Sequence, residues 1–242
     1  WRDEARKWSV PYSTDHGSDT DWYDLLTQVG MTQNHTLSFG NGTSTSSFRA
    51  SVSSIQQEGV VINSSNKNFI GRINATQKAL DGKLKFELNL NNSVRRNIGS
   101  PGYVGRAAFS SNLITNTYVS KPTDPVLAED GSYFYDVNVF QYINPYAVAK
   151  TIVNESENHN LFGGLRADLE LTKALSVGWF GSWRKVDYNS GYYAPAISTL
   201  SNAIDNDGVA NVRTSMTDEK LMDISLNYNK SFGLHKVSGV AV

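Results

Sequence analysis

The stretch from Asn68 to Asn92, NFIGRINATQKALDGKLKFELNLNN, contains two alternating segments joined by a tight turn. From Leu84 to Leu90 every second residue is Leu or Phe, and the residues between them are charged or carry amides. Because successive side chains of a strand point to opposite faces, this pattern predicts a strand with one apolar and one polar face. Asp81 and Gly82 are residue types that a tight hairpin turn favours. The stretch therefore predicts a β-hairpin with its turn at 79–83, and the function depends on whether its faces meet a protein core, lipid or water.

The same period of two recurs on both sides of this hairpin. Clusters of Asn, Ser, Thr, Gly and Lys, which are typical of turns, separate the alternating segments. We therefore expect eight strands, at residues 35–41, 46–58, 68–79, 83–97, 161–172, 175–189, 220–232 and 235–242.

Two stretches lack the alternation and are expected to be long loops. Residues 95–160 are dense in Tyr, Asn, Pro and Asp, and residues 190–218 are mostly polar. Loops of this length are rare in compact domains and are usually functional. Helical turns are expected within the first loop, at 107–114 and at 144–153.

The lengths of the connections alternate along the chain. Connections 41–46, 79–83, 172–175 and 232–235 are short, whereas those between them are mostly long. In an antiparallel meander this places every tight turn at one end of the sheet and every long loop at the other. Outer-membrane barrels show this asymmetry, with short periplasmic turns and long extracellular loops, and Greek-key sandwiches have no reason to keep it. The prediction is an all-β fold that forms part of a large antiparallel transmembrane β-barrel.

The first 31 residues are expected to connect this sheet to something upstream. Residues 1–19 are polar and irregular, and Thr20 or Asp19 can cap a short amphipathic helix that ends at Gly30. The chain starts with Trp and stops inside an alternating segment, so we expect a piece of a larger protein. The expected organisation is a connector at 1–31 followed by a partial barrel of about eight strands at 32–242, by the period-2 pattern.

Composition removes several functional classes. The 22 Lys and Arg nearly balance the 23 Asp and Glu, so the chain as a whole has no electrostatic field for nucleic acid or for an anionic membrane surface. The chain has no Cys, which excludes disulfides, thiolate metal sites and thiol nucleophiles. No run of 18 apolar residues exists, which excludes a transmembrane helix. A membrane β-barrel is not excluded, since its strands are short and only half apolar.

The two faces of the strands carry different chemistry. In a barrel, charged residues of the polar face line the lumen, and apolar residues of the other face meet lipid. In a water-facing sheet the same charges would be an ordinary solvated face. Trp179 and Trp183 on the apolar face suit the aromatic girdle at a membrane interface, although two tryptophans buried in a protein core would give the same pattern. The expected lumen residues are Arg49, Arg72, Lys85, Glu87, Arg166, Asp168, Glu170, Arg184 and Asp223, and the expected lipid-facing residues are Leu84, Phe86, Leu88, Leu165, Leu169, Val177, Trp179, Trp183, Ile224 and Leu226.

The sequence offers no positive sign of catalysis. His16, His35, His159 and His235 occur singly, with no second His or carboxylate at ligand spacing, so neither a metal site nor a cofactor is expected. No nucleophile elbow, phosphate-binding loop or zinc-protease motif occurs. Loop carboxylates at Asp124, Asp130 and Asp136 are candidates for cation binding, although carboxylates in such loops are more often simply solvated. We expect a protein that is not an enzyme.

Aromatic residues of the loops are candidates for contact with a ligand or a partner. Rings interleaved with Asn and Asp are suited to stacking on sugars or peptides, yet packing of the loops on each other explains the same residues, and packing or partner contact is favoured. The candidates are Tyr118, Tyr133, Tyr135, Tyr142, Tyr146, Tyr192 and Tyr193.

A series of short motifs occurs in a recognisable order. The motifs are TDW at 20–22, QNHTLSF at 33–39, FRASV at 48–52, QEG at 57–59 and RIN at 72–74, followed in the first loop by PTDPV at 122–126, DGSY at 130–133 and NP at 144–145. In this order they resemble the early barrel of the SusC/RagA family of TonB-dependent outer-membrane transporters. The resemblance covers most of residues 20–189. One departure is FGNG at 39–42, where the family usually has a plainer Ser-Gly-Gly.

The resemblance implies a place just after a plug domain, in the first third of a barrel of about 22 strands. It implies import of a glycan, oligosaccharide or peptide across the outer membrane, powered by the TonB complex through regions outside this chain and covered by a SusD-like surface lipoprotein. The alternatives are a soluble all-β lectin or adhesin, a TonB-dependent receptor for a siderophore or vitamin, and a passive porin or outer-membrane enzyme. Packing of the apolar face against a second sheet of the same chain would exclude the barrel.

Overall fold

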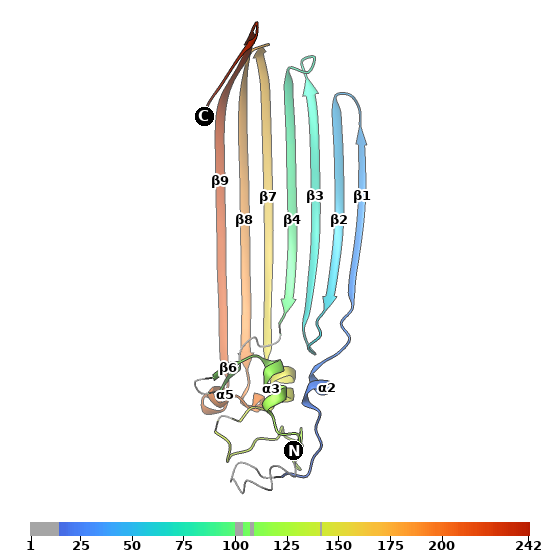
Figure 1. The fold of residues 1–242 in the computed structure, drawn as a ribbon, viewed down its shortest axis with the longest axis vertical. Coiled ribbons are helices and arrows are strands. Elements are labelled where there is room, and N and C mark those ends of the chain that lie inside the picture. Colours follow the sequence, from blue (N-terminus) through green and yellow to red (C-terminus); the bar gives the residue numbers. More distant parts are fainter. Residues whose placement is uncertain (1–14, 100–103, 107–108, 141) are drawn as a thin grey trace.

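The computed structural model describes residues 15–99, 104–106, 109–140 and 142–242. In this part of the chain, eight strands form one antiparallel sheet in the order β1-β2-β3-β4-β7-β8-β9-β10 (Figure 1). The strands are β1 Thr32–Gly42, β2 Ser46–Glu58, β3 Ser65–Ala79, β4 Leu84–Ile98, β7 Val153–Thr172, β8 Leu175–Ala194, β9 Val209–Phe232 and β10 His235–Ala241. The all-β prediction is confirmed.

The hairpin predicted at 68–92 is formed by β3 and β4. Their pairing runs without a bulge to the pair of Ala79 and Leu84, next to the turn. Asp81 and Gly82 have φ values of 54° and 86°, as the turn prediction requires, and Leu80 also has a positive φ of 53°. The backbone N–H groups of Gly82 and Lys83 close the turn on the carbonyls of Ala79 and Leu80, at 3.1 Å each.

The tight turns all lie at one end of the sheet, and the longer connections lie at the other (Figure 1). The two predicted long loops are shorter than expected. The strands β4, β7, β8 and β9 extend into them, so that residues 99–152 and 195–208 connect the strands instead of 95–160 and 190–218. These added strand residues lack apolar alternation, and the backbone ladder continues the strands there together with side-chain contacts such as the Arg96–Glu157 ion pair. Among the described residues between β4 and β7, none forms a strand of the main sheet, as predicted.

Within the first long connection, β5 (Val104–Arg106) and β6 (Phe109–Ser111) form a separate two-stranded sheet among the described residues. The helical turn predicted at 107–114 was therefore misplaced, since the helix α3 spans Leu113–Val119 after an Asn112 cap. Residues 107–108 lie outside the described part. The other predicted helix is confirmed as α4, Pro145–Thr151.

The helix before the sheet is shorter than predicted. The helix α2 spans Trp22–Leu26, and its cap is Asp21, whose side chain accepts a hydrogen bond from Asp24 N, rather than Thr20 or Asp19. The helix does not reach Gly30 because the backbone after Leu26 pairs with residues 60–62. Residues 1–14 of the predicted connector lie outside the described part. Two further short helices, η2 (Ala196–Ser198) and α5 (Ser201–Asp205), were not predicted.

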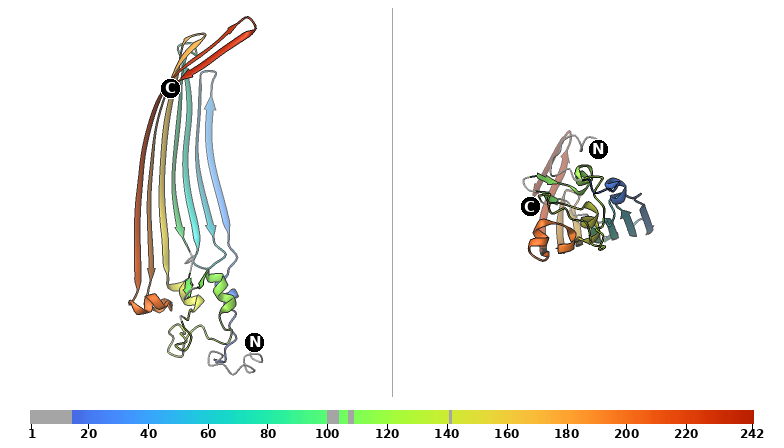
Figure 2. Two further views of the ribbon diagram at one scale, coloured as in Figure 1. Left: turned by 60° about the vertical axis from the view of Figure 1, so that its left-hand side comes forward. Right: turned by 90° about the horizontal axis from the view of Figure 1, so that it is seen from below.

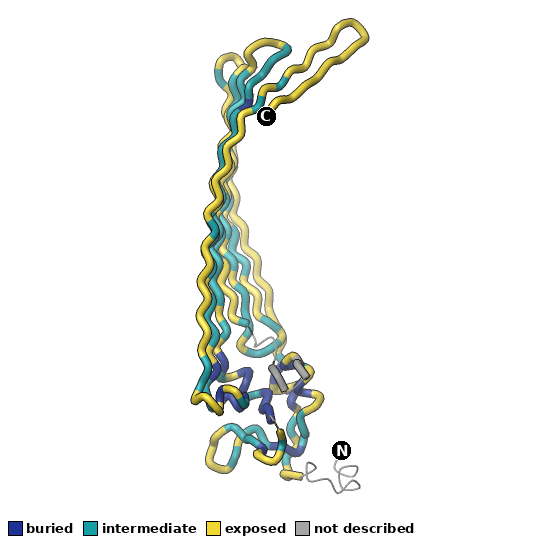
Figure 3. The backbone as a smooth tube through the Cα atoms, turned by 90° about the vertical axis from the view of Figure 1, so that its left-hand side faces the viewer, coloured by how far each residue is buried: buried dark blue, intermediate teal, exposed yellow. Residues whose placement is uncertain are grey.

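The buried apolar residues gather among these helices and at the adjoining end of β8, not along the sheet. The cluster contains Leu26, Leu113, Ile143, Val148, Ala149, Ile152, Ala194, Leu200 and Ala203. Figures 2 and 3 show that the short helices lie at the long-loop end, on one side of the sheet. In the described part of the chain, no second sheet covers the strands. No helix among these residues is long and apolar enough to cross a membrane.

Candidate functional site

The strand register gathers the predicted lipid-facing residues on a single face of the sheet, the apolar face. Leu84 pairs with Leu169, Leu169 with Val177, and Val177 with Leu226, and all four lie on that face. Parallel rows bring Leu88 beside Leu165, and Trp179 beside Ile224. The larger apolar side chains here are partly open, and Ile224 is 58 % exposed. This face has no apolar partner among the described residues.

The predicted lumen residues lie on the opposite, polar face, where they form charge-complementary rows. Glu87 pairs in register with Arg166, and Lys85 with Asp168. Lys85 Nζ lies 2.5 Å from Glu87 Oε1. The Arg166 guanidinium donates to both carboxylate oxygens of Asp168, at 2.7 and 2.9 Å. Phe180, an apolar residue on this face, lies between Arg166 and Asp223.

The helices lie on the polar-face side of the sheet, at its long-loop end. Tyr192 and Ala194 share the polar face of β8 with Arg184, because they are separated by even numbers of residues. Ala194 belongs to the buried cluster of the helices, and Tyr192 packs against it. The helices therefore fold over the same face that carries the charged rows, which agrees with their one-sided position in Figure 3.

The TDW and PTDP motifs contact each other directly. Thr20 N donates to Pro122 O at 2.7 Å, and the Thr20 hydroxyl donates to Asp124 O at 2.6 Å. The indole N–H of Trp22 donates to Lys121 O at 2.9 Å. The segment before the sheet is thus fixed to the first long connection, although about a hundred residues separate the two motifs in the chain.

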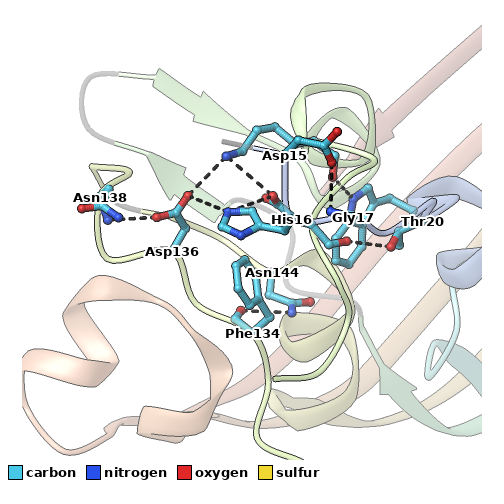
Figure 4. A network of polar contacts seen from close by, with 11 residues as sticks. Asp15, His16, Gly17, Thr20, Phe134, Asp136, Asn138 and Asn144 are labelled. Atoms are coloured by element: carbon cyan, nitrogen blue, oxygen red, sulfur yellow. Dashed lines mark hydrogen bonds and ion pairs between the residues drawn. The ribbon is translucent and has the colours of Figure 1, made fainter. Parts of the chain in front are cut away.

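A buried charge cluster lies beside this contact (Figure 4). Lys121 Nζ is 3.2 Å from Asp136 Oδ2 and 3.6 Å from Asp124 Oδ1, and His16 Nε2 is 3.6 and 3.8 Å from the same two atoms. Burial raises the pKa of the Asp124 carboxyl and outweighs the opposing effect of Lys121. Burial also acts to raise the pKa of Asp136, but hydrogen bonds from Asn138 N and Lys121 lower it overall.

Asn144 joins three parts of the loop region. Its side-chain amide donates to Val126 O at 2.9 Å and to Phe134 O at 3.2 Å. Its carbonyl oxygen caps α4 by accepting from Ala147 N, and its backbone N–H donates to the Thr199 hydroxyl at 2.9 Å. Asn144 is completely buried, so each of these bonds replaces one that water would otherwise make.

The candidate tyrosines occupy different surroundings. Tyr118 is 72 % exposed and stacks on Tyr23, with ring centroids 5.9 Å apart. Tyr142 is buried, with edge contacts to Phe134 and Tyr135. The remaining candidates are a Tyr133–Tyr146 pair at 6.4 Å, the half-buried Tyr192, and Tyr193 on the apolar-face side. Tyr142 and Tyr192 thus pack within the protein, whereas Tyr118 is open to a ligand or partner.

Sequence reasoning missed the contacts that link distant segments. It treated the histidines as isolated, yet His16 lies between two carboxylates, and His159 is paired with Glu157. Asn144 had a local signal, because Asn before Pro is a helix-start pattern. Among the described residues, no group of three or more His, Asp or Glu side chains is placed to hold a metal ion.

Comparison with known proteins extends the sequence resemblance. No protein-family model matches the chain. TonB-dependent receptor P3 of Formosa agariphila is 26 % identical over 243 residues, covering 98 % of this chain and 24 % of the receptor. TonB-dependent receptor P26 of the same organism is 28 % identical over 165 residues, covering 66 % of this chain and 16 % of the receptor. The chain thus spans no more than about a quarter of the length of these relatives.

Solved structures give the same fold. The RagAB peptide transporter superposes with a TM-score of 0.69 at 18 % identity, covering 92 % of this chain and 25 % of the compared chain. The open-open state of the RagAB peptide importer gives a TM-score of 0.69 as well. These similarities confirm the resemblance to the SusC/RagA family of TonB-dependent outer-membrane transporters, and the sheet is part of an outer-membrane β-barrel of this type.

Proposed function

We propose that the chain forms part of the channel wall of a TonB-dependent importer of a large nutrient, a glycan, oligosaccharide or peptide. The observation that carries the proposal is the separation of the two faces over the paired strands. The apolar face is uncovered and suits lipid, and the polar face carries paired charges and suits a water-filled lumen. In this proposal residues 32–242 are barrel wall and residues 1–31 connect it to the preceding part.

The position of the apolar residues supports a tilted membrane barrel. The apolar run of β1 is centred at Ser38, and the register leads from Ser38 across the sheet to Glu219 on β9. The apolar run of β9, Met222–Tyr228, is centred six residues further on, at Ser225. This displacement is roughly 20 Å along the strands over roughly 29 Å across six strand spacings. The apolar band thus deviates by about 35° from the perpendicular to the strands, which corresponds to a strand tilt of about 35° from the barrel axis, as in outer-membrane barrels.

The proposed orientation places the tight turns in the periplasm and the long connections outside the cell. The helices of the long connections fold over the polar face, and so would narrow the outer mouth of the channel. Tyr118 and the Tyr133–Tyr146 pair are the candidate contacts there for the nutrient or for a SusD-like lid. The RagAB transporter is described as a peptide transporter, which supports the class of large nutrients. Energy would come from the TonB complex, and no catalytic role is proposed.

The two faces can be tested on one strand of the full-length receptor. The chain has no Cys, so single spin-labelled cysteines are unambiguous within it. In lipid bilayers we expect labels at Ile224→Cys and Leu226→Cys to collide with oxygen, which concentrates in lipid. Labels at Asp223→Cys and Ser225→Cys should collide with a water-soluble nickel chelate. In a soluble module, labels on the apolar face would be buried in protein and would collide rarely with either reagent.

Orientation and transport need their own measurements. On intact cells, a membrane-impermeant maleimide should label Val137→Cys, which lies in the first long connection, and should spare Leu234→Cys at a tight turn. Uptake of glycans or peptides should require the receptor and the TonB complex. Uptake that persists without TonB would contradict active import and favour a passive porin.

A further inference from the structure

The tight-turn end of the sheet combines exposed apolar side chains with lysines. The pattern recurs at three of the four turns: Leu80 with Lys83, Leu171 with Lys173, and Phe232 and Leu234 with Lys230 and Lys236. We refer to these eight residues as the turn rim. The turn at 43–45 has neither residue type. Three separate turns with the same pairing point to one continuous surface with which they interact.

The apolar members of the turn rim are unusually open. Leu80 is 63 % exposed, and Leu234 is fully exposed. Leu80 also adopts a left-handed backbone conformation, which Gly, Asn or Asp would occupy at lower cost. Neither the turn geometry nor contact with water favours a leucine there. An apolar environment outside the described residues explains its presence.

The charge at this end is positive. Residues 78–84, 170–175 and 228–238 contain five lysines, Lys78, Lys83, Lys173, Lys230 and Lys236, and two carboxylates, Asp81 and Glu170. Among the described residues no carboxylate lies within ion-pair distance of Lys83, Lys173 or Lys230. Lys230 Nζ lies over the Phe232 ring, 4.9 Å from its centroid. The rim therefore offers ammonium groups to an anion that it does not itself contain.

The turn rim continues the apolar face without a break. Leu84 directly follows the turn that holds Leu80 and Lys83. On β9 the apolar-face positions run from Leu226 through Tyr228 and Lys230 to Phe232. An apolar band that ends in aromatic rings and lysines matches the boundary between acyl chains and headgroups, where lysines extend their charge to the polar layer.

We infer that the turn rim binds the headgroups of anionic phospholipids in the inner leaflet of the outer membrane. The lysines contact lipid phosphates, while Leu80, Phe232 and Leu234 enter the layer just beneath them. This inference rests on the orientation proposed above, with the tight turns on the periplasmic side. It adds a lipid ligand, which fixes the depth of the barrel in the bilayer, to the transport proposal.

The test measures lipid selectivity of the full-length receptor in phosphatidylcholine bilayers with spin-labelled phosphatidylglycerol as the probe. The unmodified receptor should prefer phosphatidylglycerol to spin-labelled phosphatidylcholine. The triple variant Lys83→Gln, Lys173→Gln, Lys230→Gln should lose this preference, by roughly fivefold for each lysine that contacts a headgroup. Replacement of the same lysines by Arg should keep it.

A matched control removes the same charge elsewhere. Arg49→Gln and Arg72→Gln on the polar face, together with Lys150→Gln in a long connection, remove three exposed positive charges that do not face lipid and should leave the preference unchanged. An equal loss in this control, or a full preference in the first triple variant, would overturn the inference. Nutrient uptake and maleimide labelling are measured on the same variants, so a failure of the transport proposal is seen separately from a failure of lipid binding.

Discussion

The indole N–H of Trp183 donates a hydrogen bond to Asp218 Oδ1 at 2.9 Å, across the pairing of β8 and β9. Trp183 is the last large apolar residue of the apolar face on β8. Lys185 and Asp187 follow it on the same face, where they form an ion pair at 3.2 Å. In the proposed barrel, an amphipathic ring held in this way would mark the boundary between lipid and water at the outer end of the apolar band.

Replacement of Trp183 by Phe tests this boundary. The phenyl ring keeps most of the apolar contact but cannot donate to Asp218, so we expect unfolding in urea to become easier by about 1 kcal/mol. Asp218→Asn removes the charge and keeps an acceptor, and should cost less. Protection of β8 amides from hydrogen exchange, measured in bilayers, should fall beside residue 183 in the Phe variant. Equal hydrogen exchange beside residue 183 in the Phe variant and in the unmodified receptor would show that the hydrogen bond has no role in the boundary.

A second prediction concerns the close packing of the polar face at Gly178. A Cβ atom there would lie 2.7 Å from Ser225 Oγ and 3.0 Å from Asp168 Oδ1, so it would displace the carboxylate that accepts from Arg166. Gly178→Ala should therefore destabilise the barrel by about 1–3 kcal/mol in urea unfolding. Gly191→Ala is the control on the same strand, because a Cβ at that position meets no atom within 4 Å. Similar losses in the two variants would contradict the steric explanation.

Asn144 should be the most sensitive residue of the loop region. Its replacement by Ala removes the cap of α4 and leaves the carbonyls of Val126 and Phe134 without their donor, at an expected cost of about 2–4 kcal/mol. Asn144→Asp keeps the capping oxygen but not the donor, so it should remain strongly destabilising. Limited proteolysis within residues 120–140 measures the opening. Asn112→Ala removes only the cap of α3 and should have a smaller effect, and the opposite order would refute this role.

The buried charge cluster predicts opposite pH effects for its two carboxylates. The folded-state pKa of Asp136 is lowered, so its ionised form stabilises the fold above the unfolded-state pKa, and this contribution is lost as the pH falls through the folded-state pKa. Asp136→Asn should therefore destabilise the loop region at neutral pH and have little effect in acid. The folded-state pKa of Asp124 is raised, so protonation favours the fold there.

Asp124→Asn should accordingly cost less than Asp136→Asn at neutral pH. Proteolysis rates of the two variants between neutral and acidic pH provide the comparison. A larger loss in Asp124→Asn at neutral pH would show that its contacts with Lys121 and His16 outweigh the cost of burying its charge.

The sequence predicted the strands wherever one face is apolar. The hairpin at 68–92 has this property along most of its length, and its turn was predicted from Asp81 and Gly82. Prediction failed at 153–160 and 190–194, where neither face shows apolar alternation, although backbone pairing continues the strands and Ala194 packs into the buried cluster of the helices. The short helices α5 and η2 are too brief to show a period of 3.6.

The loop contacts were beyond prediction for a different reason. Asn144 binds residues that are 10, 18 and 55 positions away in the chain, and no local pattern encodes such distances. His16 meets Asp124 and Asp136 only because Thr20 and Trp22 fix its segment to residues 121–124. The motifs could be recognised in order along the chain, but their mutual contact emerges only in the folded protein.

The apolar face lacks any covering layer among the described residues, and this has a consequence for how the protein forms. A water-soluble domain gains most of its hydrophobic stabilisation when its own chain closes over a core. In the proposed barrel, the greater part of that stabilisation is gained only when the apolar face contacts the acyl chains of the bilayer. We therefore expect folding and membrane insertion to occur together. Before insertion the exposed apolar strands are prone to aggregate, so we expect them to need a chaperone.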